Sequence, residues 1–266
     1  MTFSPGARLA LRLAMLFGLA IIYLPLLVVL INSLNISRTF GWPPSGLTLE
    51  WWTRAADSTG LREALLASVL VALGATAIAL LLGTMLAFAV QRYRFFGRQA
   101  VSLLVILPIA LPGIVTGIAL NAAFTAGGIP FGYLTVIIGH ATFCIVVVHN
   151  NVLARLRRTG TSLQEASMDL GANGFRTFRW ITLPQLKSSL VAGGLLAFAL
   201  SFDEIVVTTF TTSPGLHTLP VWIFENLFRP NQAPVVNVAA AALIMLSIIP
   251  IWASQRLSPT PAGGRL

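Results

Sequence analysis

Six long apolar segments constrain this chain more than any other feature. They cover residues 13–31, 64–90, 100–124, 133–153, 188–212 and 235–254. Each is long enough to cross ~30 Å of hydrocarbon as a helix of about 20 residues. Hydrophobic residues make up 56% of the chain and charged residues only 9%, too few to cover a water-soluble surface. We therefore expect an all-α membrane protein with six transmembrane helices, one domain over 1–266, and a disordered tail at 258–266.

The basic residues are divided unevenly between the two predicted sides of the membrane. Thirteen Lys and Arg residues lie near the two termini, between the second and third segments, or between the fourth and fifth, and four lie in the remaining loops. Cytoplasmic loops hold an excess of Lys and Arg, so both termini and the loop 155–187 are predicted to be cytoplasmic. This topology explains the net charge of +9, and the charge therefore gives no support to nucleic-acid binding.

The loops of the opposite side carry aromatic residues and turn residues. Residues 32–63 include Trp42, Trp51 and Trp52, which favours anchoring at the membrane interface by a short helix lying near the headgroups. Residues 213–234 are rich in proline and should be ordered by turns. A partner outside the membrane could contact both loops. The first apolar segment is too long for a cleaved signal sequence and is expected to remain as the first helix.

Two prolines interrupt the third apolar segment. Pro108 and Pro112 remove backbone donors where an undisturbed membrane helix would need them. We expect a kinked helix inside the bundle. Gly113 and Gly117 form a face of small residues that suits close helix packing, and we favour packing over a moving hinge.

A short helix is expected in the polar loop 155–187. Ser162 and Glu165 fit the spacing of a capping box, with Ser162 as the N-cap. Gly171 can adopt the left-handed conformation that ends a helix, so the helix is placed at 162–171. Leu163, Ala166 and Leu170 would then share one face.

This short helix needs support from outside itself. A helix of about two turns is marginal in water, because nucleation is costly. Asp169 in its last turn opposes the helix dipole, which suggests a basic partner, either Arg176 or Arg179 or a residue of another subunit. Asn173 can cap a second amphipathic segment that leads through Pro184 into the fifth membrane helix.

Two acidic residues fall within the fifth apolar segment. Asp203 and Glu204 are costly in a membrane helix, by ~2.5–3.5 kcal/mol each, and usually face a polar interior. We hypothesise that at least one of them attracts a cationic solute. The alternative is a structural role, in a hydrogen bond between helices or at the membrane interface.

Enzyme chemistry finds little support in the sequence. It contains no phosphate-binding G-x-x-x-x-G-K-[ST], no H-E-x-x-H and no G-x-S-x-G, so we predict no catalytic residue, metal site or cofactor in this chain. His140 and His149 are expected to hydrogen-bond within the bundle, and the single Cys144 allows no internal disulfide. A secondary transporter would be expected to show inverted repeats, which are not apparent, and would have no use for a docking helix.

The polar loop resembles a known sequence signature. Glu165-Ala166-Ser167, followed by Gly171 and then by Ile181, Leu183 and Pro184, is similar to the EAA loop of ABC-importer permeases. Ser167 departs from the usual second alanine. In that family the short helix fits a cleft on a cytoplasmic ATPase. The expected docking surface here comprises Ser162, Glu165, Ala166, Ser167, Asp169, Leu170, Gly171, Ala172 and Pro184.

Three further segments resemble one subfamily. Residues 139–144, 201–207 and 211–220 are similar to spermidine/putrescine permeases of the shorter, second-subunit type. The resemblance implies a type I ABC importer permease fold in a bacterial inner membrane. It also implies two ATPase subunits that bind ATP and Mg, a second related permease, an extracytoplasmic solute-binding protein and a polyamine substrate. A permease for another small solute of the same family is the alternative, and an ion-coupled secondary transporter is less favoured.

Overall fold

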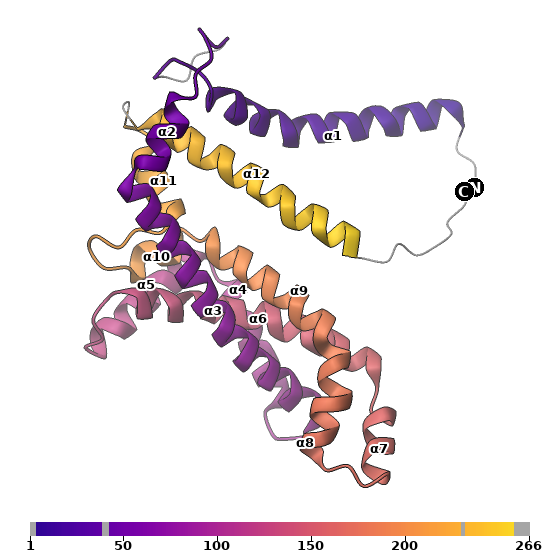
Figure 1. The fold of residues 1–266 in the computed structure, drawn as a ribbon. Coiled ribbons are helices and arrows are strands. Elements are labelled where there is room, and N and C mark those ends of the chain that lie inside the picture. The colour runs from indigo at the N-terminus through magenta and orange to yellow at the C-terminus, as the bar shows by residue number, and fades with distance from the viewer. Residues whose placement is uncertain (1–3, 39–42, 230–231, 258–266) are drawn as a thin grey trace. The chain divides into compact units, whose positions relative to one another are not determined.

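The computed structural model describes residues 4–38, 43–229 and 232–257, and the predicted disordered tail lies outside these ranges. Within them the regular elements are helices (Figure 1), and one isolated β-bridge joins Asn35 to Leu47. The all-α prediction is confirmed. The chain divides into two compact units, Met1–Leu61 with Ile223–Leu266, and Arg62–Trp222.

The described ranges contain helices of very different length. They are α1 (Pro5–Asn32), α2 (Glu50–Asp57), α3 (Thr59–Arg92), α4 (Arg98–Ala110), α5 (Gly113–Ala126), α6 (Tyr133–Thr159), α7 (Ser162–Asp169), α8 (Gly174–Thr177), the π-helix η1 (Phe178–Thr182), α9 (Leu183–Phe202), α10 (Val206–Thr211), α11 (Leu219–Asn226) and α12 (Ala233–Leu257).

Several of these helices are long and apolar enough to cross a membrane. Four qualify among the described residues, namely α1, α3, α6 and the continuous run Gly174–Phe202, and a fifth is added if α4 and α5 count as one span. The sixth predicted segment falls on α12, a helix of 25 residues in which the apolar part with described side chains is Ala233–Met245. A membrane protein with several spans is supported, and the count of six stays a prediction.

The third predicted segment is broken, which corrects the expectation of a single kinked helix. α4 contains Pro108 and ends at Ala110, and α5 begins at Gly113 after a bend of 106°. Pro112 disfavours the helical conformation for the residue before it, and Leu111 is extended, with ψ 144°. The peptide chain therefore leaves one helix and starts another.

The larger unit is built around α3, α6 and α9. Small residues of α3, among them Ala79, Gly83 and Ala87, let the backbones approach closely. A Cβ added at Gly83 would lie 2.9 Å from the carbonyl oxygen of Ile145, so this position has no room for a side chain. Cys144 is fully buried in the same core. The three helices thus form the scaffold on which the short elements are mounted.

The smaller unit contains the short helix predicted for loop 32–63, which is α2. The side chain of Trp51 is only 4% exposed, and its indole N–H donates to the carbonyl oxygen of Asn35 over 2.9 Å. Arg54 lies over the Trp51 ring at 4.9 Å from the ring centroid. Trp51 therefore anchors the loop within its own unit, whereas the sequence suggested anchoring in the headgroup layer.

Candidate functional site

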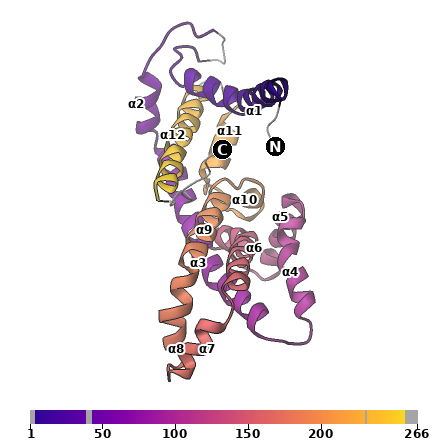
Figure 2. The ribbon, with the colours of Figure 1, turned by 90° about the vertical axis from the view of Figure 1, so that its right-hand side faces the viewer.

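The polar loop folds into α7, α8 and η1 at one end of α3, α6 and α9 (Figure 2). α7 begins at Ser162, as expected, but the predicted capping box does not form. Thr161 is the N-cap and makes no side-chain cap bond, and its carbonyl oxygen accepts from the N–H groups of Gln164 and Glu165, each over 3.0 Å. The first turn is therefore closed by the backbone alone.

The end of α7 is held by the glycine that the sequence indicated. Gly171 has a φ of +85°, the left-handed region that glycine adopts without strain. The N–H of Gly171 donates to the carbonyl oxygen of Met168 over 2.9 Å, and the N–H of Ala172 donates to the carbonyl oxygen of Ser167 over 3.1 Å. These two bonds form a Schellman motif, which satisfies carbonyls left free at the helix end. The helix ends at Asp169, two residues before the predicted limit.

The inner face of α7 is attached to the scaffold through a few polar contacts. Gln164 is buried, and its Oε1 accepts from Nη1 of Arg92, the last residue of α3, over 3.4 Å. Ser167 and Thr177 join α7 to α8 by a hydroxyl–hydroxyl bond of 3.1 Å. A cavity of about 260 Å³ remains under the helix, between it and the ends of α3 and α6. The attachment of α7 is thus light.

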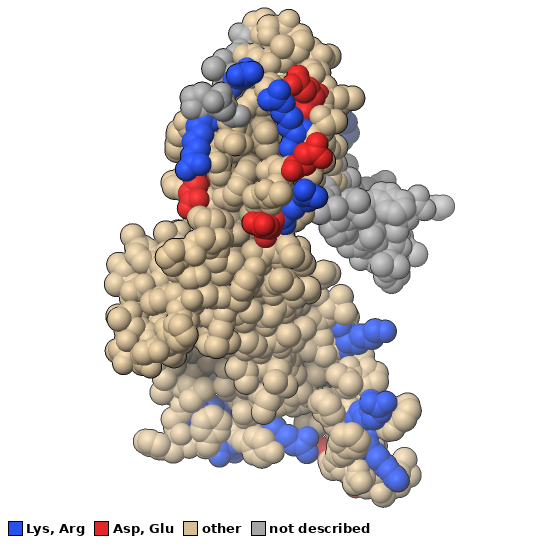
Figure 3. Space-filling model, turned by 60° about the vertical axis from the view of Figure 1, so that its left-hand side comes forward, with Lys and Arg blue, Asp and Glu red and all other residues tan. Residues whose placement is uncertain are grey.

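The outer face of this end carries exposed apolar side chains. Leu170 is 89% exposed, Phe175 73% and Trp180 70%, and Leu163 is also exposed. Asp169 has no basic side chain within ion-pairing distance among the described residues, so the expected pairing with Arg176 or Arg179 is not made. Arg179 lies over the Trp180 ring, 5.7 Å from its centroid, and Figure 3 shows other blue side chains at this end, below an uncharged expanse of the same unit. Such an apolar patch in a charged setting is typical of a protein interaction surface.

The segment after α7 runs without interruption into the membrane helix α9. Asn173 caps α8 as predicted, and its Oδ1 accepts from the N–H of Arg176 over 2.9 Å. η1 follows because Pro184 has no N–H to donate to the preceding turn, and the N–H of Leu183 instead reaches the carbonyl of Phe178, five residues back. Phe178 also meets Phe88 of α3 edge-on, with ring centroids 5.8 Å apart.

The fifth predicted segment, 188–212, is not one helix, and this changes the setting of both acidic residues. α9 ends at Phe202 and α10 begins at Val206, so Asp203 and Glu204 lie in the break between them. Oε1 of Glu204 accepts from the N–H of Val207 over 2.9 Å and satisfies a donor of the first turn of α10. Asp203 is exposed, and its carboxylate has no partner among the described residues.

The break is held by a buried histidine. His140 of α6 is fully buried, with Nδ1 2.8 Å from the Ser201 hydroxyl of α9 and Nε2 2.8 Å from the Thr208 hydroxyl of α10. The Thr208 hydroxyl donates its hydrogen to the carbonyl oxygen of Glu204 over 2.8 Å, so its oxygen accepts from Nε2–H and the Ser201 hydroxyl donates to Nδ1. A neutral ring satisfies every member of this network. The expectation that His140 hydrogen-bonds within the bundle is confirmed.

Two further polar side chains fix the other end of α10. Nδ2 of Asn121 in α5 donates to the carbonyl oxygen of Phe210 over 2.7 Å. The Thr135 hydroxyl of α6 donates to the carbonyl oxygen of Thr211, also over 2.7 Å. They satisfy carbonyls at the C-terminal end of a helix of only six residues. Sequence reasoning did not single out Asn121, Thr135 or Thr208. Each is a polar residue within an apolar segment, a pattern that could have indicated a hydrogen bond between helices.

Close packing of glycines completes this region. A Cβ added at Gly117 of α5 would lie 2.6 Å from the Phe210 ring, and one at Gly113 would lie 3.6 Å from Val206. The small-residue face therefore packs against α10. Together, α5, α6 and α9 hold α10 and present the exposed carboxylate of Asp203 beside it.

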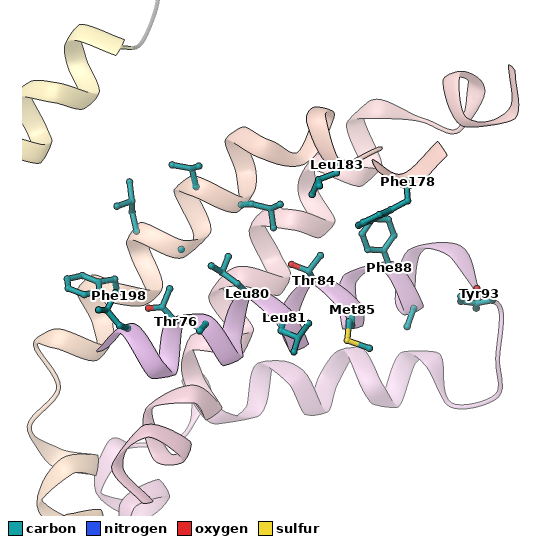
Figure 4. Close-up of a pocket in the computed structure, with 17 residues that line it drawn as sticks. Thr76, Leu80, Leu81, Thr84, Met85, Phe88, Tyr93, Phe178, Leu183 and Phe198 are labelled. Carbon is teal, nitrogen blue, oxygen red and sulfur yellow. The ribbon is translucent and has the colours of Figure 1, made fainter. Parts of the chain in front are cut away.

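A large groove of the same unit is lined almost entirely by apolar side chains. It measures about 1040 Å³ and runs between α3 and α9, with Phe88 and Phe178 at one end (Figure 4). Its described lining is apolar apart from the hydroxyls of Thr76, Thr84 and Tyr93, and it includes no charged residue. This groove offers nothing to bind a charged solute and suits lipid chains or a helix of another subunit.

Comparisons with known proteins place this arrangement in a family. Residues 79–261 match the model of the binding-protein-dependent transport system inner membrane component. Over 239 residues the chain is 34% identical to the spermidine/putrescine transport system permease protein PotC of Escherichia coli, covering 90% of each chain. It is 33% identical to the putrescine transport system permease protein PotI of the same organism, covering 87% of this chain and 84% of PotI.

A solved structure shares the fold. A chain from the crystal structure of a bacterial ABC transporter involved in import of the acidic polysaccharide alginate superposes with a TM-score of 0.70 at 16% identity, covering 97% of this chain and all of that one. Identity this low supports the fold alone. The family match and the two relatives cover most of the chain, so this protein belongs to the inner-membrane components of binding-protein-dependent transport systems.

Proposed function

We propose that this chain is the permease subunit of an ATP-driven importer and forms half of the pathway for a small cationic solute, a polyamine such as spermidine or putrescine. The observation that carries the proposal is the similarity to PotC and PotI along nearly the whole chain. It is supported by the absence of a P-loop in the sequence, because the energy must then come from another polypeptide.

The proposed setting is a bacterial inner membrane crossed six times, with both termini in the cytoplasm. The distribution of basic residues, thirteen against four, supports this orientation. α4 and α5 together would form the third span, and α12 the sixth. The arginine-rich end that carries α7 would then face the cytoplasm.

The proposed partners are two ATPase subunits, a second related permease and an extracytoplasmic solute-binding protein. An ATPase would dock on the surface formed by α7 and the residues after it, from Ser162 to Ala172, with Pro184 at the start of α9. ATP and Mg would be bound by the ATPase. The exposed apolar side chains Leu163 and Leu170 support this role, because they have no reason to face water in an isolated subunit.

The proposed solute contact is Asp203. Its carboxylate is exposed and has no partner, whereas that of Glu204 caps α10 and is already engaged. An anionic group at a break between two membrane helices is a suitable contact for an ammonium group, since irregular backbone in a membrane is tolerated where it lines a cavity. Glu204 would act by holding the break in shape.

Uptake of labelled spermidine by cells lacking other polyamine transporters tests the proposal. The complete transporter should restore uptake that depends on ATP and persists when ionophores remove ion gradients. The double variant D203N/E204Q should slow uptake strongly while the complex still assembles. Unchanged uptake by that variant would refute the proposed solute contact, and uptake driven by an ion gradient without ATP would identify a secondary transporter.

The single variants divide the two roles. D203N should reduce uptake nearly as much as the double variant, because it removes the free charge. E204Q keeps an oxygen that can accept from Val207, so its effect should be smaller. The exposed Glu63 of α3, which lies outside both the break and the docking segment, provides the matched control. E63Q also removes one carboxylate and should leave uptake at the native rate.

A further inference from the structure

A basic cavity lies between the ends of α3, α4 and α6, and none of its lining residues belongs to the docking segment or to the break at Asp203. It measures about 580 Å³ and is lined by Val90, Arg98, Gln99, Leu103 and Arg157. Two guanidinium groups from different helices thus share one cavity, and its lining includes no Asp or Glu. α4 lies beside α6 in Figure 2.

The backbone adds to the positive character of the cavity. α4 begins at Arg98 after Gly97, whose φ of +84° turns the chain, and no side chain caps its first N–H groups. No acidic residue lies in the first turn of α4. The free N–H groups and the helix dipole therefore attract the same kind of ligand as Arg98 and Arg157, which is an anion.

The position of the cavity indicates where that anion comes from. Arg98, Gln99 and Leu103 all line the cavity, and Leu103 lies about one turn further along α4. Leu103 is 71% exposed and Leu104 63%, so this side of α4 presents hydrocarbon directly after its basic start. A ligand that fits has an anionic head and an apolar body, as a phospholipid does.

We propose that this cavity binds the headgroup of an anionic phospholipid, with the phosphate between Arg98 and Arg157 and an acyl chain along the exposed leucines of α4. Arginine suits this role because its planar fork donates two parallel hydrogen bonds to phosphate oxygens. The headgroup would join the start of α4 to the end of α6, two elements whose side chains share no hydrogen bond among the residues that the structure describes.

Lipid retention by the purified full-length chain tests this site. The chain would be reconstituted in nanodiscs of phosphatidylglycerol and phosphatidylcholine, re-extracted in mild detergent, and its bound lipid quantified by mass spectrometry. The variant is R98Q/R157Q. The matched control is R94Q/R158Q, which removes two neighbouring arginines that do not line the cavity.

We expect R98Q/R157Q to lower the enrichment of phosphatidylglycerol by about 25-fold, since each basic residue near an anionic surface contributes a factor of about five. R94Q/R158Q should change it by much less. If both variants lost the same enrichment of phosphatidylglycerol, the general surface charge and not this cavity would bind the lipid, and the proposed site would be wrong. Equal retention of phosphatidylglycerol and phosphatidylcholine by the native chain would also contradict it. Release of bound phosphatidylglycerol by inorganic phosphate at millimolar concentration would identify a free-phosphate site and contradict the lipid assignment.

Discussion

The two functional regions of the larger unit are built in opposite ways. Around α10, the ring nitrogens of His140 and the terminal carbonyls of Phe210 and Thr211 all have hydrogen-bond partners, supplied by α5, α6, α9 and α10 itself. α7 is attached to the scaffold through Gln164 and exposes its apolar residues, with Leu170 at 89%. In the first region the chain satisfies these hydrogen bonds itself, whereas in the second region apolar side chains remain exposed for another molecule to cover.

This difference has a physical reason. A polar group in hydrocarbon finds no water, so a helix break there must be satisfied from within the chain. A short helix outside the membrane can leave its exposed face to a partner, and a light attachment lets it move with that partner. Changes at α10 should therefore act on the stability of this chain, and changes on the outer face of α7 should act on assembly.

The largest expected effect is that of L170D on assembly. A charge at position 170, where the native leucine is 89% exposed, should remove an anchor worth about 2–4 kcal/mol, a weakening of roughly 30-fold or more. The tagged variant should lose its ATPase during purification, as measured by quantitative mass spectrometry. L47D is the control, because Leu47 is also 70% exposed but belongs to the other unit. Retention of the ATPase by L170D would contradict the role of this patch.

H140L should be the most damaging change for the stability of the chain itself. It leaves the buried Ser201 hydroxyl without its partner, at a cost of about 1–3 kcal/mol. It also removes the bond from Nε2–H to Thr208, whose hydroxyl keeps its own bond to Glu204. The midpoint of thermal unfolding in detergent should fall, while ATPase binding by the remaining folded protein stays normal. T209V is the control, since the exposed Thr209 hydroxyl bonds only to its own helix at Ile205. Equal midpoints for H140L and T209V would show that the network does not hold the break.

E204A and E204Q separate the capping role of Glu204 from its charge. Alanine removes the acceptor for the Val207 N–H and should cost ~1 kcal/mol, as loss of a helix cap does. Glutamine keeps an acceptor and should be closer to the native chain in a thermal unfolding measurement. If both variants were destabilised equally, the charge of Glu204 and not its hydrogen bond would stabilise α10.

The smallest expected effect is that of Q164A. It removes the bond from Arg92 to α7, worth about 0.5–1.5 kcal/mol, without touching the exposed patch. The ATPase should still co-purify, but spermidine uptake per assembled complex should fall, because the helix is less firmly joined to α3. T159V is the control, because the Thr159 hydroxyl bonds only to carbonyl oxygens of its own helix α6, and it should leave uptake at the native rate. Unchanged uptake by Q164A would show that the hydrogen bond between Arg92 and Gln164 does not transmit movement of α7 to α3.

The docking end was largely readable from sequence because its signals are local. Gly171 and Asn173 act within a few residues of themselves, and both adopt the predicted conformations. The capping box failed because backbone bonds to Thr161 close the first turn without Ser162. The break before α5 also has a local cause in Pro112, although its size exceeds the predicted kink.

The break at Asp203 could not be read in the same way. Residues 188–212 remain apolar, and neither proline nor glycine marks positions 203–205. What holds the break is tertiary, since His140 lies 61 residues before Ser201 and Asn121 lies 89 residues before Phe210. A hydropathy pattern reports which residues meet lipid, and it carries no information about which distant side chains satisfy a free carbonyl.

The docking of an ATPase on the segment after α7 can be tested by site-specific photo-crosslinking from position 170 of the otherwise native chain, in its own membrane. A photoreactive amino acid in place of Leu170 would be activated by light and its adducts identified by mass spectrometry. If an ATPase docks on this segment, position 170 should give an adduct with a polypeptide that carries a P-loop, and position 47 of the same chain should give none. Adducts with lipid alone, or with no polypeptide although the chain is folded and abundant, would contradict it.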